Sequence, residues 1–414
     1  MSLPFQNQKQ SFVSNLCQYR IIRLSPYIIF LTLSCLLLLY VHNHNTNFLI
    51  NGKILSKSIL NYAINNNTST YNDIKTLKFD DSPSLKYTNL DWFRKGYNQT
   101  NDFVQLQDYN QCPSCNFESR SLRSNSSPQD AILITMLNCT YNLVPFTRSL
   151  RTTGSKALVV IFIDDLAKQK IDTSLSTFAA NCGITFIYIG KTNFTRNELL
   201  LFRNPLLFDF LKLRPNLFKR ILIVDLFDSI FQGDPFYEDF DTTTVGFSVE
   251  THRCDVGQIR NAGYLVGKKQ AKVFFNHSCV NIGTIVGCYE HVVMFLYHYV
   301  NYLKNIPEEK MKKLYWIPDQ VILNTMINLK ITDELGIKIH LYKNDEPYAV
   351  LMNLFKTKGV PFDVGYFKPY ENSMYPFVVH LFDRSRRFCK SVLDRCPQIF
   401  PTNDSYIRCS GEYK

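Results

Sequence analysis

Short apolar runs alternate with longer amphipathic segments from about residue 131 onward. Four of the runs predict strands: AILITMLN, ALVVIFIDD, ITFIYIG and ILIVD. Two segments between them predict helices: YNLVPFTRSLRTTG, which ends at Gly154, and NELLLFRNPLLFDFLKL, which has its own apolar stripe. Apolar strands that alternate with helices are typical of a mainly parallel sheet covered on both faces. We therefore predict an α/β fold over residues 129–388, with a mixed, mainly parallel sheet flanked by helices.

A second hydrophobic pattern lies near the N-terminus. Residues 27–41 (YIIFLTLSCLLLLYV) are apolar and uncharged, and the flanking residues extend this run toward the length of a membrane span. Lys9, Arg20 and Arg23 precede it without any acidic residue, so residues 1–26 should be cytosolic and the rest of the chain lumenal. A cleaved signal peptide is the alternative, although VHNHNTN offers no small-residue cleavage site. We predict an uncleaved signal-anchor in a single-pass type II membrane protein.

Two further segments flank the predicted domain. Residues 42–128 are rich in Asn, Ser and Thr with little sustained periodicity, which predicts a stem. Ten of the 12 cysteines follow the predicted span, an even number in a compartment that permits disulfides. Cys112 and Cys115 form a CPSC sequence that fits a tight loop bridge, a redox pair or half of a zinc site, although no second CxxC follows. Residues 389–414 hold three closely spaced cysteines, which predicts a disulfide-stapled tail.

Acceptor triplets for N-glycosylation agree with a lumenal body. They begin at Asn66, Asn67, Asn98, Asn125, Asn138, Asn193, Asn276 and Asn403. Each triplet alone is a weak signal, because such triplets arise by chance in an Asn-rich chain. Asn138 falls in a predicted strand, where a glycan would not fit.

Composition limits the classes of protein that remain. Hydrophobic residues make up 45% of the 414 residues and aromatic residues 14%, which supports a large core and excludes wholesale disorder. The formal net charge of +11 favours anionic ligands or a membrane surface, or else reflects composition alone. No block of Lys and Arg is long enough to predict a nucleic-acid-binding arm, so we expect no nucleic-acid partner. A homodimer is left open.

Candidate chemistry appears where the strand ILIVD ends. Asp225 and Asp228 follow the apolar run, before a turn around Gly233 to Pro235. Ligands of parallel sheets bind at the carboxyl ends of the strands. Two carboxylates there suit a hard divalent cation that keeps open positions for a diphosphate. The structural alternative is that Asp225 caps the turn and Asp228 is merely solvated.

This stretch resembles the Asp-rich motif of GT-A-fold, metal-dependent glycosyltransferases. The motif D-x-x-D-x-x-F-Q-x-D-P-F is matched by Asp225, Asp228, Phe231, Gln232, Asp234, Pro235 and Phe236. Many members of this family carry Arg before the second Asp, where this chain has Phe227, so the chain departs from the family pattern at a position expected to contact phosphate. Three later segments are similar to family motifs in the same order. They contain Asn281, Gly283 and Gly287; Asp319, Gln320 and Asn324; and His380, Asp383 and Arg384.

The resemblance implies a GT-A, Rossmann-like domain that transfers a sugar from a nucleoside diphosphate to a glycan, protein or lipid acceptor. The enzyme would be a Golgi or endoplasmic reticulum membrane protein that requires Mn²⁺ or Mg²⁺. Asp225, Asp228 and His380 would hold the ion, and Asp225 would also face the ribose. Asp319 and Gln320 would lie at the reacting centre, with Glu250 in reserve.

The remaining donor contacts also follow from the resemblance. Thr135 and Asn138 would lie beneath the base, and Asn281 and Gly283 would form the floor of the sugar site. Arg203 would reach the diphosphate, or else only decorate its helix.

Each of these residues also has a structural alternative. Asp319 follows Pro318 at the start of an apolar helix and fits an N-cap. Gln320 would simply face water, and His380 would be a satisfied core histidine. A catalytically inactive lumenal protein with lectin-like or scaffolding function would keep the same fold, and Phe227 is the feature that favours it.

Overall fold

The computed structural model describes Phe103, Leu106, residues 108–399 and Cys409, apart from positions 122, 193, 352–361, 364, 365 and 371. The predicted membrane span at residues 27–41 and the cytosolic tail lie outside the described residues. Among the described residues, no helix is long and apolar enough to cross a membrane.

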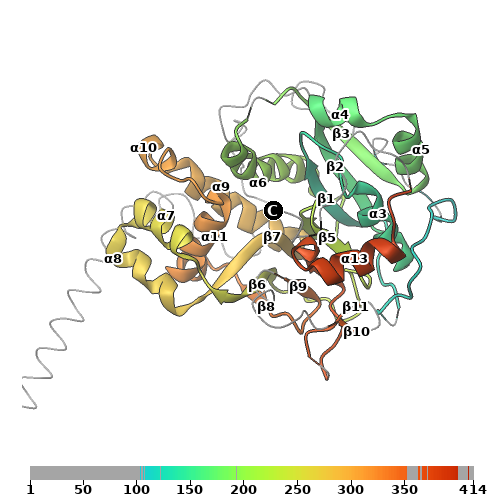
Figure 1. The fold of residues 1–414 in the computed structure, drawn as a ribbon. Helices are drawn as coiled ribbons and strands as arrows, with labels where there is room; N and C mark the ends of the chain where they lie inside the picture. The colour runs from blue at the N-terminus through green and yellow to red at the C-terminus, as the bar shows by residue number, and fades with distance from the viewer. Residues whose placement is uncertain are drawn as a thin grey trace, which may run out of the picture. The chain divides into compact units, whose positions relative to one another are not determined.

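A seven-stranded mixed sheet forms the centre of the described chain (Figure 1). Its strands are β1 (Asp130–Met136), β2 (Leu158–Asp164), β3 (Ile184–Gly190), β4 (Arg220–Val224), β6 (Val245–Arg253), β7 (Ser278–Cys288) and β8 (Ile339–Tyr342). They lie in the order β3-β2-β1-β4-β7-β6-β8. The first four are parallel, and β7 is antiparallel to both neighbours. The predicted α/β fold with a mixed, mostly parallel sheet is confirmed.

Two smaller sheets lie beside the central one. The first contains β5 (Ser229–Phe231), β9 (Tyr348–Val350) and β12 (Val378–His380), and the second contains β10 (Phe362–Asp363) and β11 (Tyr366–Phe367). Strand β12 lies between β5 and β9, antiparallel to β5, and this register places His380 opposite Ser229. The loop between β4 and β5 is therefore held next to the end of β12.

Helices cover both faces of the central sheet. One face is packed by α6 (Arg196–Lys212), α7 (Val256–Val266), α9 (Tyr289–Lys304) and α11 (Pro318–Asn328), and the other by α3 (Leu143–Thr152), α4 (Asp165–Lys170) and α5 (Thr173–Asn181). Shorter helices are α8 (Lys268–Ala271), η2 (Lys272–Asn276), α10 (Glu308–Met311), α12 (Ile331–Glu334) and η3 (Phe382–Arg384), and α13 (Arg386–Arg395) follows the last strand. The side chains of Asp164, Asp172, Thr195 and Asp255 cap four of these helices by accepting a backbone N–H of the first turn.

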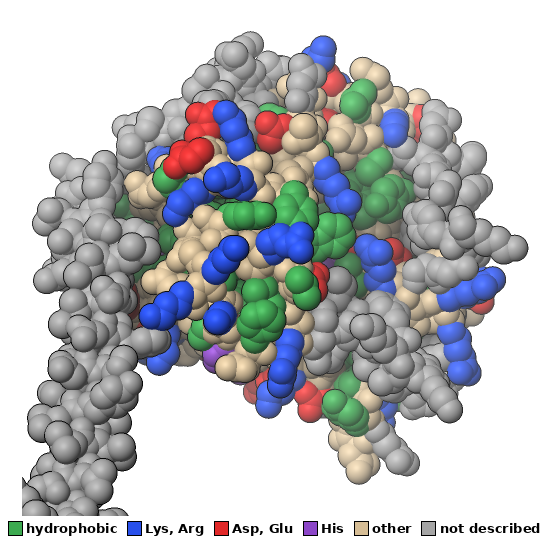
Figure 2. Space-filling view, turned by 60° about the vertical axis from the view of Figure 1, so that its left-hand side comes forward, with side chains coloured by type: hydrophobic (Ala, Val, Ile, Leu, Met, Phe, Trp, Pro, Cys, Tyr) green, Lys and Arg blue, Asp and Glu red, His purple; other side chains and the backbone are tan. Residues whose placement is uncertain are grey.

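One face of the molecule carries basic and exposed hydrophobic side chains together. Figure 2 shows Lys and Arg side chains around exposed hydrophobic ones on the face that carries α7, α8 and α10. This surface belongs to helices that lie on the same side of the sheet as α11.

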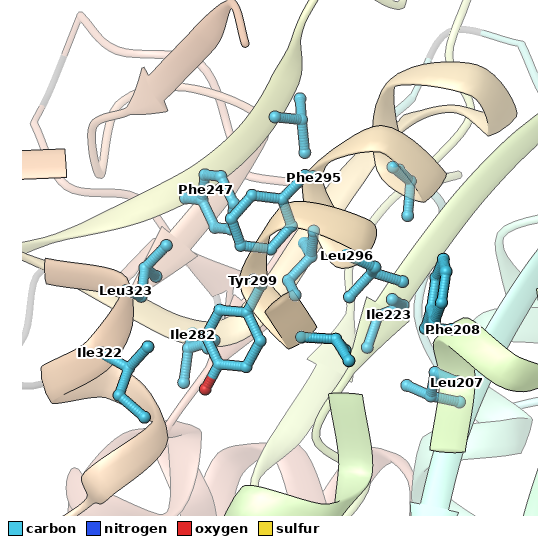
Figure 3. Close-up of a cluster of buried hydrophobic side chains, with 14 of the residues drawn as sticks. Leu207, Phe208, Ile223, Phe247, Ile282, Phe295, Leu296, Tyr299, Ile322 and Leu323 are labelled. Atoms are coloured by element: carbon cyan, nitrogen blue, oxygen red, sulfur yellow. The ribbon is translucent and has the colours of Figure 1, made fainter. Parts of the chain in front are cut away.

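The core follows from the alternation of side chains along strands that are buried on both faces. In β4, Ile221 and Ile223 point toward the α6, α9 and α11 layer, whereas Leu222 and Val224 point toward the α3 layer. Figure 3 shows Phe295 and Tyr299 of α9 beside Phe247 of β6, and the Phe247 and Phe295 rings are 4.9 Å apart in an edge-to-face arrangement. Each such buried side chain stabilises the fold by about 1.5–3 kcal/mol.

Helix α6 differs from the prediction of an apolar stripe. All residues from Phe202 to Leu211 are buried, and they include Arg203, Asn204 and Asp209. The helix is enclosed on all sides in this half because the sheet, α9 and α11 surround it. A charged residue in such a helix requires a partner inside the protein.

Four disulfides link distant parts of the described chain. They are Cys112–Cys182, Cys115–Cys396, Cys254–Cys279 and Cys389–Cys409. The three uses predicted for CPSC are all wrong, since Cys112 and Cys115 join the ends of α5 and α13 instead. The Cys389–Cys409 disulfide lies within the predicted tail, whereas Cys396 pairs with Cys115 outside it. Several disulfides indicate an oxidising compartment of the secretory pathway.

Candidate metal centre

Three predicted metal ligands come together at the carboxyl end of β4. The apolar strand ends at Val224, and the backbone N–H of Asp225 donates to the carbonyl of Gly283 in β7 at 3.0 Å. The chain then turns through Asp228 into β5, whose pairing with β12 brings His380 over both carboxylates. One ligand atom from each of Asp225, Asp228 and His380 lies within 4.8 Å of the others. The group is a possible site for a metal ion.

The two ring nitrogens of His380 face different partners. Nδ1 lies 3.1 Å from Asp228 Oδ1 and 3.1 Å from Ser229 Oγ. Nε2 lies 3.9 Å from Asp225 Oδ2, too far for a hydrogen bond. Burial lowers the pKa of the imidazole, but Asp228 and Asp225 raise this pKa more, so the net pKa is above its ordinary value. His380 is buried, as expected for a core histidine, but it also has two carboxylate neighbours, as expected for a metal ligand.

Gly283 makes room for His380. A Cβ at position 283 would lie 2.2 Å from His380 Nε2 and 2.9 Å from Asn281 Oδ1. The Gly283 backbone N–H also donates to Asn281 Oδ1 at 2.7 Å. The backbone of β7 thus passes directly under the imidazole, which explains why a glycine stands at this position.

Arg203 is not an exposed residue on the surface of its helix, so the structural alternative given for it is wrong. Its side chain is 7% exposed, its Nη1 pairs with Asp225, and its Nη2 lies 3.0 Å from Asp319 Oδ2. Nη2 also donates to the carbonyl of Ile282 at 3.1 Å. Burial lowers the pKa of the guanidinium, but Asp225 and Asp319 raise it more, so Arg203 remains charged. In the sequence, Arg203 is the only charged residue between Glu198 and Asp209, and this isolated charge in an apolar helix was the signal that it is buried with a partner.

Asp319 lies in the first turn of α11 rather than at the N-cap. The N-cap position belongs to Ile317, which has a left-handed backbone conformation with φ 34° and no capping side chain. The Asp319 side chain is 1% exposed, and its Oδ1 accepts the backbone N–H of Gln320 at 2.9 Å. Burial raises the pKa of this carboxyl, and the adjacent Arg203 opposes the rise. The N-cap alternative for Asp319 is wrong, because Ile317 holds that position and Asp319 turns inward toward Arg203.

The other predicted residues of the reacting centre form a second buried group. Glu250 Oε1 accepts Nδ2 of Asn281 at 3.0 Å and Nε2 of Gln320 at 2.9 Å. Gln320 therefore does not face water. Because Asn281 also binds Gly283, this group connects to the strand beneath His380. The contacts place these side chains around one region, and their catalytic or binding roles stay predictions.

Thr135 and Asn138 lie at the end of β1. The strand stops at Met136, so Asn138 is outside it, half-buried and left-handed with φ 67°. The objection that a strand excludes a glycan at Asn138 is therefore wrong. The Asn138 N–H donates to Asp164 Oδ1 at 3.0 Å, and its carbonyl accepts Lys170 Nζ at 2.9 Å. These contacts connect Asn138 to β2 and α4.

Phe227 occupies the position where many relatives of the resembled family carry Arg. Its ring stacks on Tyr141 with centroids 4.5 Å apart. Asn142 Nδ2 donates to the carbonyls of Leu226 at 2.7 Å and Ser229 at 3.1 Å, which clamps the two loops together. An aromatic pair therefore borders Asp228, and sequence reasoning did not anticipate it because Tyr141 is distant in the sequence.

Backbone strain collects at the same edge of the sheet. Among the described residues, five non-glycine residues have positive φ: Asn138, Asn142, Ile317, Lys330 and Leu381. Asn142 and Leu381 adjoin the loops that carry Asp228 and His380, and Ile317 precedes Asp319. Such conformations cost about 1–3 kcal/mol each and persist where the surrounding structure enforces them, often at functional sites.

The second half of the Asp-rich motif supports the loop. Gln232 accepts the N–H of Phe367 at 2.6 Å and donates to the carbonyl of Pro376 at 2.9 Å. Asp234 Oδ2 accepts the N–H groups of Asn125 and Ser126, each at 3.0 Å. These two side chains therefore connect the motif to its neighbours rather than to the cluster of three ligands.

The donor set fits a hard divalent cation. Asp228 Oδ1 is buried, and no described residue makes a hydrogen bond to it with suitable geometry, although His380 Nδ1 is close. Two ligands that bind one ion at about 2.1–2.3 Å lie roughly 3–4 Å apart, which matches the 3.9 Å between Asp225 Oδ2 and His380 Nε2. Ser229 Oγ beside Nδ1 would orient the ring. Two carboxylates and one imidazole are ligands of the kind that divalent metal ions bind in proteins.

No protein-family model and no curated protein matches this chain. The fold and the cluster therefore define the protein as a Rossmann-like α/β protein with an Asp-Asp-His group at the carboxyl end of its central strand.

Proposed function

We propose that the protein is a glycosyltransferase of the secretory pathway that moves a sugar from a nucleoside-diphosphate donor to a glycan, protein or lipid acceptor. The observation that carries this proposal is the Asp225, Asp228 and His380 group at the edge of the sheet where such folds bind ligands. The order of the four motifs that resemble glycosyltransferases supports it. We further propose a Golgi or endoplasmic reticulum membrane location, with the domain in the lumen.

The reaction breaks the bond between the anomeric carbon and the diphosphate oxygen and forms a bond to an acceptor oxygen. Negative charge then grows on the departing diphosphate, and the proton of the acceptor hydroxyl passes to a diphosphate oxygen or to water. Mn²⁺ or Mg²⁺ held by Asp225, Asp228 and His380 would stabilise that charge. Asp228 and Asp225 would bind and orient the cation, and Ser229, 3.1 Å from Nδ1, would orient the ring of His380.

Arg203 maintains this arrangement. Because its guanidinium holds both Asp225 and Asp319, the first carboxylate is fixed in place without a direct bond to His380. Asp319 and Glu250 are each engaged by neighbouring groups, and these contacts favour a positioning role over that of a base. Gln320 and Asn281 would then present the floor on which the donor sugar lies.

A catalytically inactive relative is the second candidate, and the Phe227–Tyr141 stack favours it. This stack stands where a phosphate-binding Arg would be expected from the resemblance, so the charge next to the diphosphate is reduced. Such a protein would bind a nucleotide or glycan in the lumen without turnover.

The test is a panel of nucleotide sugars incubated with the full chain, purified from a secretory host, with Mn²⁺ or with chelator. Release of free nucleoside diphosphate from one donor, dependent on Mn²⁺, supports the transferase. Mn²⁺-dependent nucleotide binding without release from any donor supports the inactive relative. No binding and no release contradicts both.

A further inference from the structure

An exposed face of mixed aromatic and basic residues begins next to the candidate site. We define this basic–aromatic face by six residues from α7, the start of α8 and the loop before α11. They are Val256, Arg260, Tyr264, Lys268, Tyr315 and Trp316. Figure 2 shows basic and hydrophobic side chains mixed on this side of the molecule.

The spacing of the α7 residues places them on one side of the helix. Val256, Arg260 and Tyr264 are four residues apart, so they follow successive turns and point outward together. Val256 is 68% exposed, unusual for a branched apolar side chain, while the opposite side of α7 is buried. Large exposed apolar side chains grouped in one patch mark interaction surfaces.

Trp316 is 43% exposed, and its backbone is held by a hydrogen bond. Its carbonyl accepts Asn261 Nδ2 at 2.8 Å, and a Cβ added at Gly257 would lie 3.6 Å from its ring. A residue whose backbone is held in place before a ligand arrives loses less freedom on binding. The apolar face of a sugar ring can pack on the exposed face of the Trp316 indole ring.

The charge of this segment is of one sign. Residues 256–276 contain Arg260, Lys268, Lys269 and Lys272 and no Asp or Glu. An anionic ligand is therefore the complement of this face.

Continuity with the candidate site favours a substrate over a membrane surface. Trp316 is followed by the strained Ile317, then Pro318 and Asp319, which turns inward to Arg203. A chain of sugar rings stacked on Trp316 would thus lie close to the buried groups around Asp225. A bilayer would need no such connection.

We propose that the basic–aromatic face is the docking surface for an anionic oligosaccharide acceptor, with a sugar ring on Trp316 and its carboxylate or sulfate groups on Arg260 and Lys268. The proposal rests on the proposed glycosyltransferase function, since it names the class of acceptor.

Intrinsic fluorescence provides the test, because Trp92 and Trp316 are the two tryptophans of the chain. In the full-chain Trp92→Phe variant, Trp316 is the sole reporter. A heparin-derived hexasaccharide should change its emission with saturation, whereas neutral maltohexaose, with the same number of rings, should bind at least about tenfold more weakly. Vesicles of phosphatidylcholine with phosphatidylserine form the third titration.

Two charge-reversal variants, one on the basic–aromatic face and one on α13, test whether the hexasaccharide binds at this face. Arg260→Glu with Lys268→Glu should weaken hexasaccharide binding at least about tenfold. Arg386→Glu with Lys390→Glu reverses two exposed charges on α13 and should change it less than about twofold. Equal losses in both variants, equal affinity for maltohexaose, no saturable change, or a response to vesicles alone would overturn the proposal.

The two proposals fail in distinguishable ways, because glycan binding is measured without donor or metal. Hexasaccharide binding by a protein that turns over no nucleotide sugar contradicts the proposed transferase and leaves a glycan-binding surface. Donor turnover without hexasaccharide binding contradicts the docking surface alone.

Discussion

Replacement of Arg203 by Met should destabilise the protein strongly, because Arg203 is the cation that two carboxylates share. It pairs with Asp225 and lies 3.0 Å from Asp319, whose side chain is 1% exposed. Arg203→Met leaves Asp319 buried without a cation. Removal of one partner from a buried ion pair costs about 3–5 kcal/mol. At roughly 2 °C per kcal/mol for a domain of this size, the melting temperature should fall by about 6–10 °C.

A second substitution tests the cause of that loss. In the double variant Arg203→Met with Asp319→Asn, the amide needs no cation, so at least about 1 kcal/mol should be recovered relative to Arg203→Met. Arg386→Met, an exposed arginine on α13, is the control and should stay within about 0.5 kcal/mol of the wild type. Urea unfolding followed by circular dichroism gives all four free energies. A loss below about 1 kcal/mol in Arg203→Met, or no recovery in the double variant, would refute the role given to Arg203.

Three further predictions concern the site and the fold. Asp228→Asn should abolish Mn²⁺-dependent turnover, by at least about a hundredfold, while Asp234→Asn should be milder because Asp234 binds loop backbone; equal losses in kcat would contradict this difference. Gly283→Ala should displace His380, since the added Cβ would lie 2.2 Å from Nε2; the His380 NMR signals should shift, and Gly263→Ala in α7, where the added Cβ meets nothing closer than 3.8 Å, is the control. Burial lowers the pKa of His298 from 6.5 to about 4. Between these two pH values, His298 is protonated in the unfolded state and neutral in the folded state. Stability contributed by neutral His298 is present above pH 6.5 and lost as the pH falls toward 4; urea unfolding of His298→Gln should show a smaller fall over that window, and an identical fall would contradict it.

The sheet and the carboxylates at its edge could be predicted because they depend on local patterns. ILIVD is apolar up to Asp225, and a buried strand that ends on carboxylates places them at the edge of the sheet. His380 was placed near them only through the resemblance, since β12 has three residues and no strong pattern of its own.

Other features depend on partners that are distant in the sequence. Arg203 is paired with Asp225, 22 residues away, and with Asp319 farther along the chain. The apolar helix suggested that Arg203 is buried, but the sequence could not show which carboxylates pair with it. Cys115 pairs with Cys396 across 281 residues, and spacing within CPSC carries no information about such a partner. The inward turn of Asp319 depends on the left-handed Ile317, a conformation that a branched residue rarely adopts.

The central claim is that Asp225, Asp228 and His380 hold one divalent cation. Electron paramagnetic resonance measures free Mn²⁺ directly during a titration of the full chain with and without a nucleoside diphosphate, and it needs no knowledge of the donor sugar or acceptor. We expect about one bound Mn²⁺ per chain in the wild type, tighter with the diphosphate, and at least about tenfold weaker binding in Asp228→Asn. Asp234→Asn should bind as the wild type does. Absence of a bound equivalent, or equal binding by Asp228→Asn, would contradict the claim.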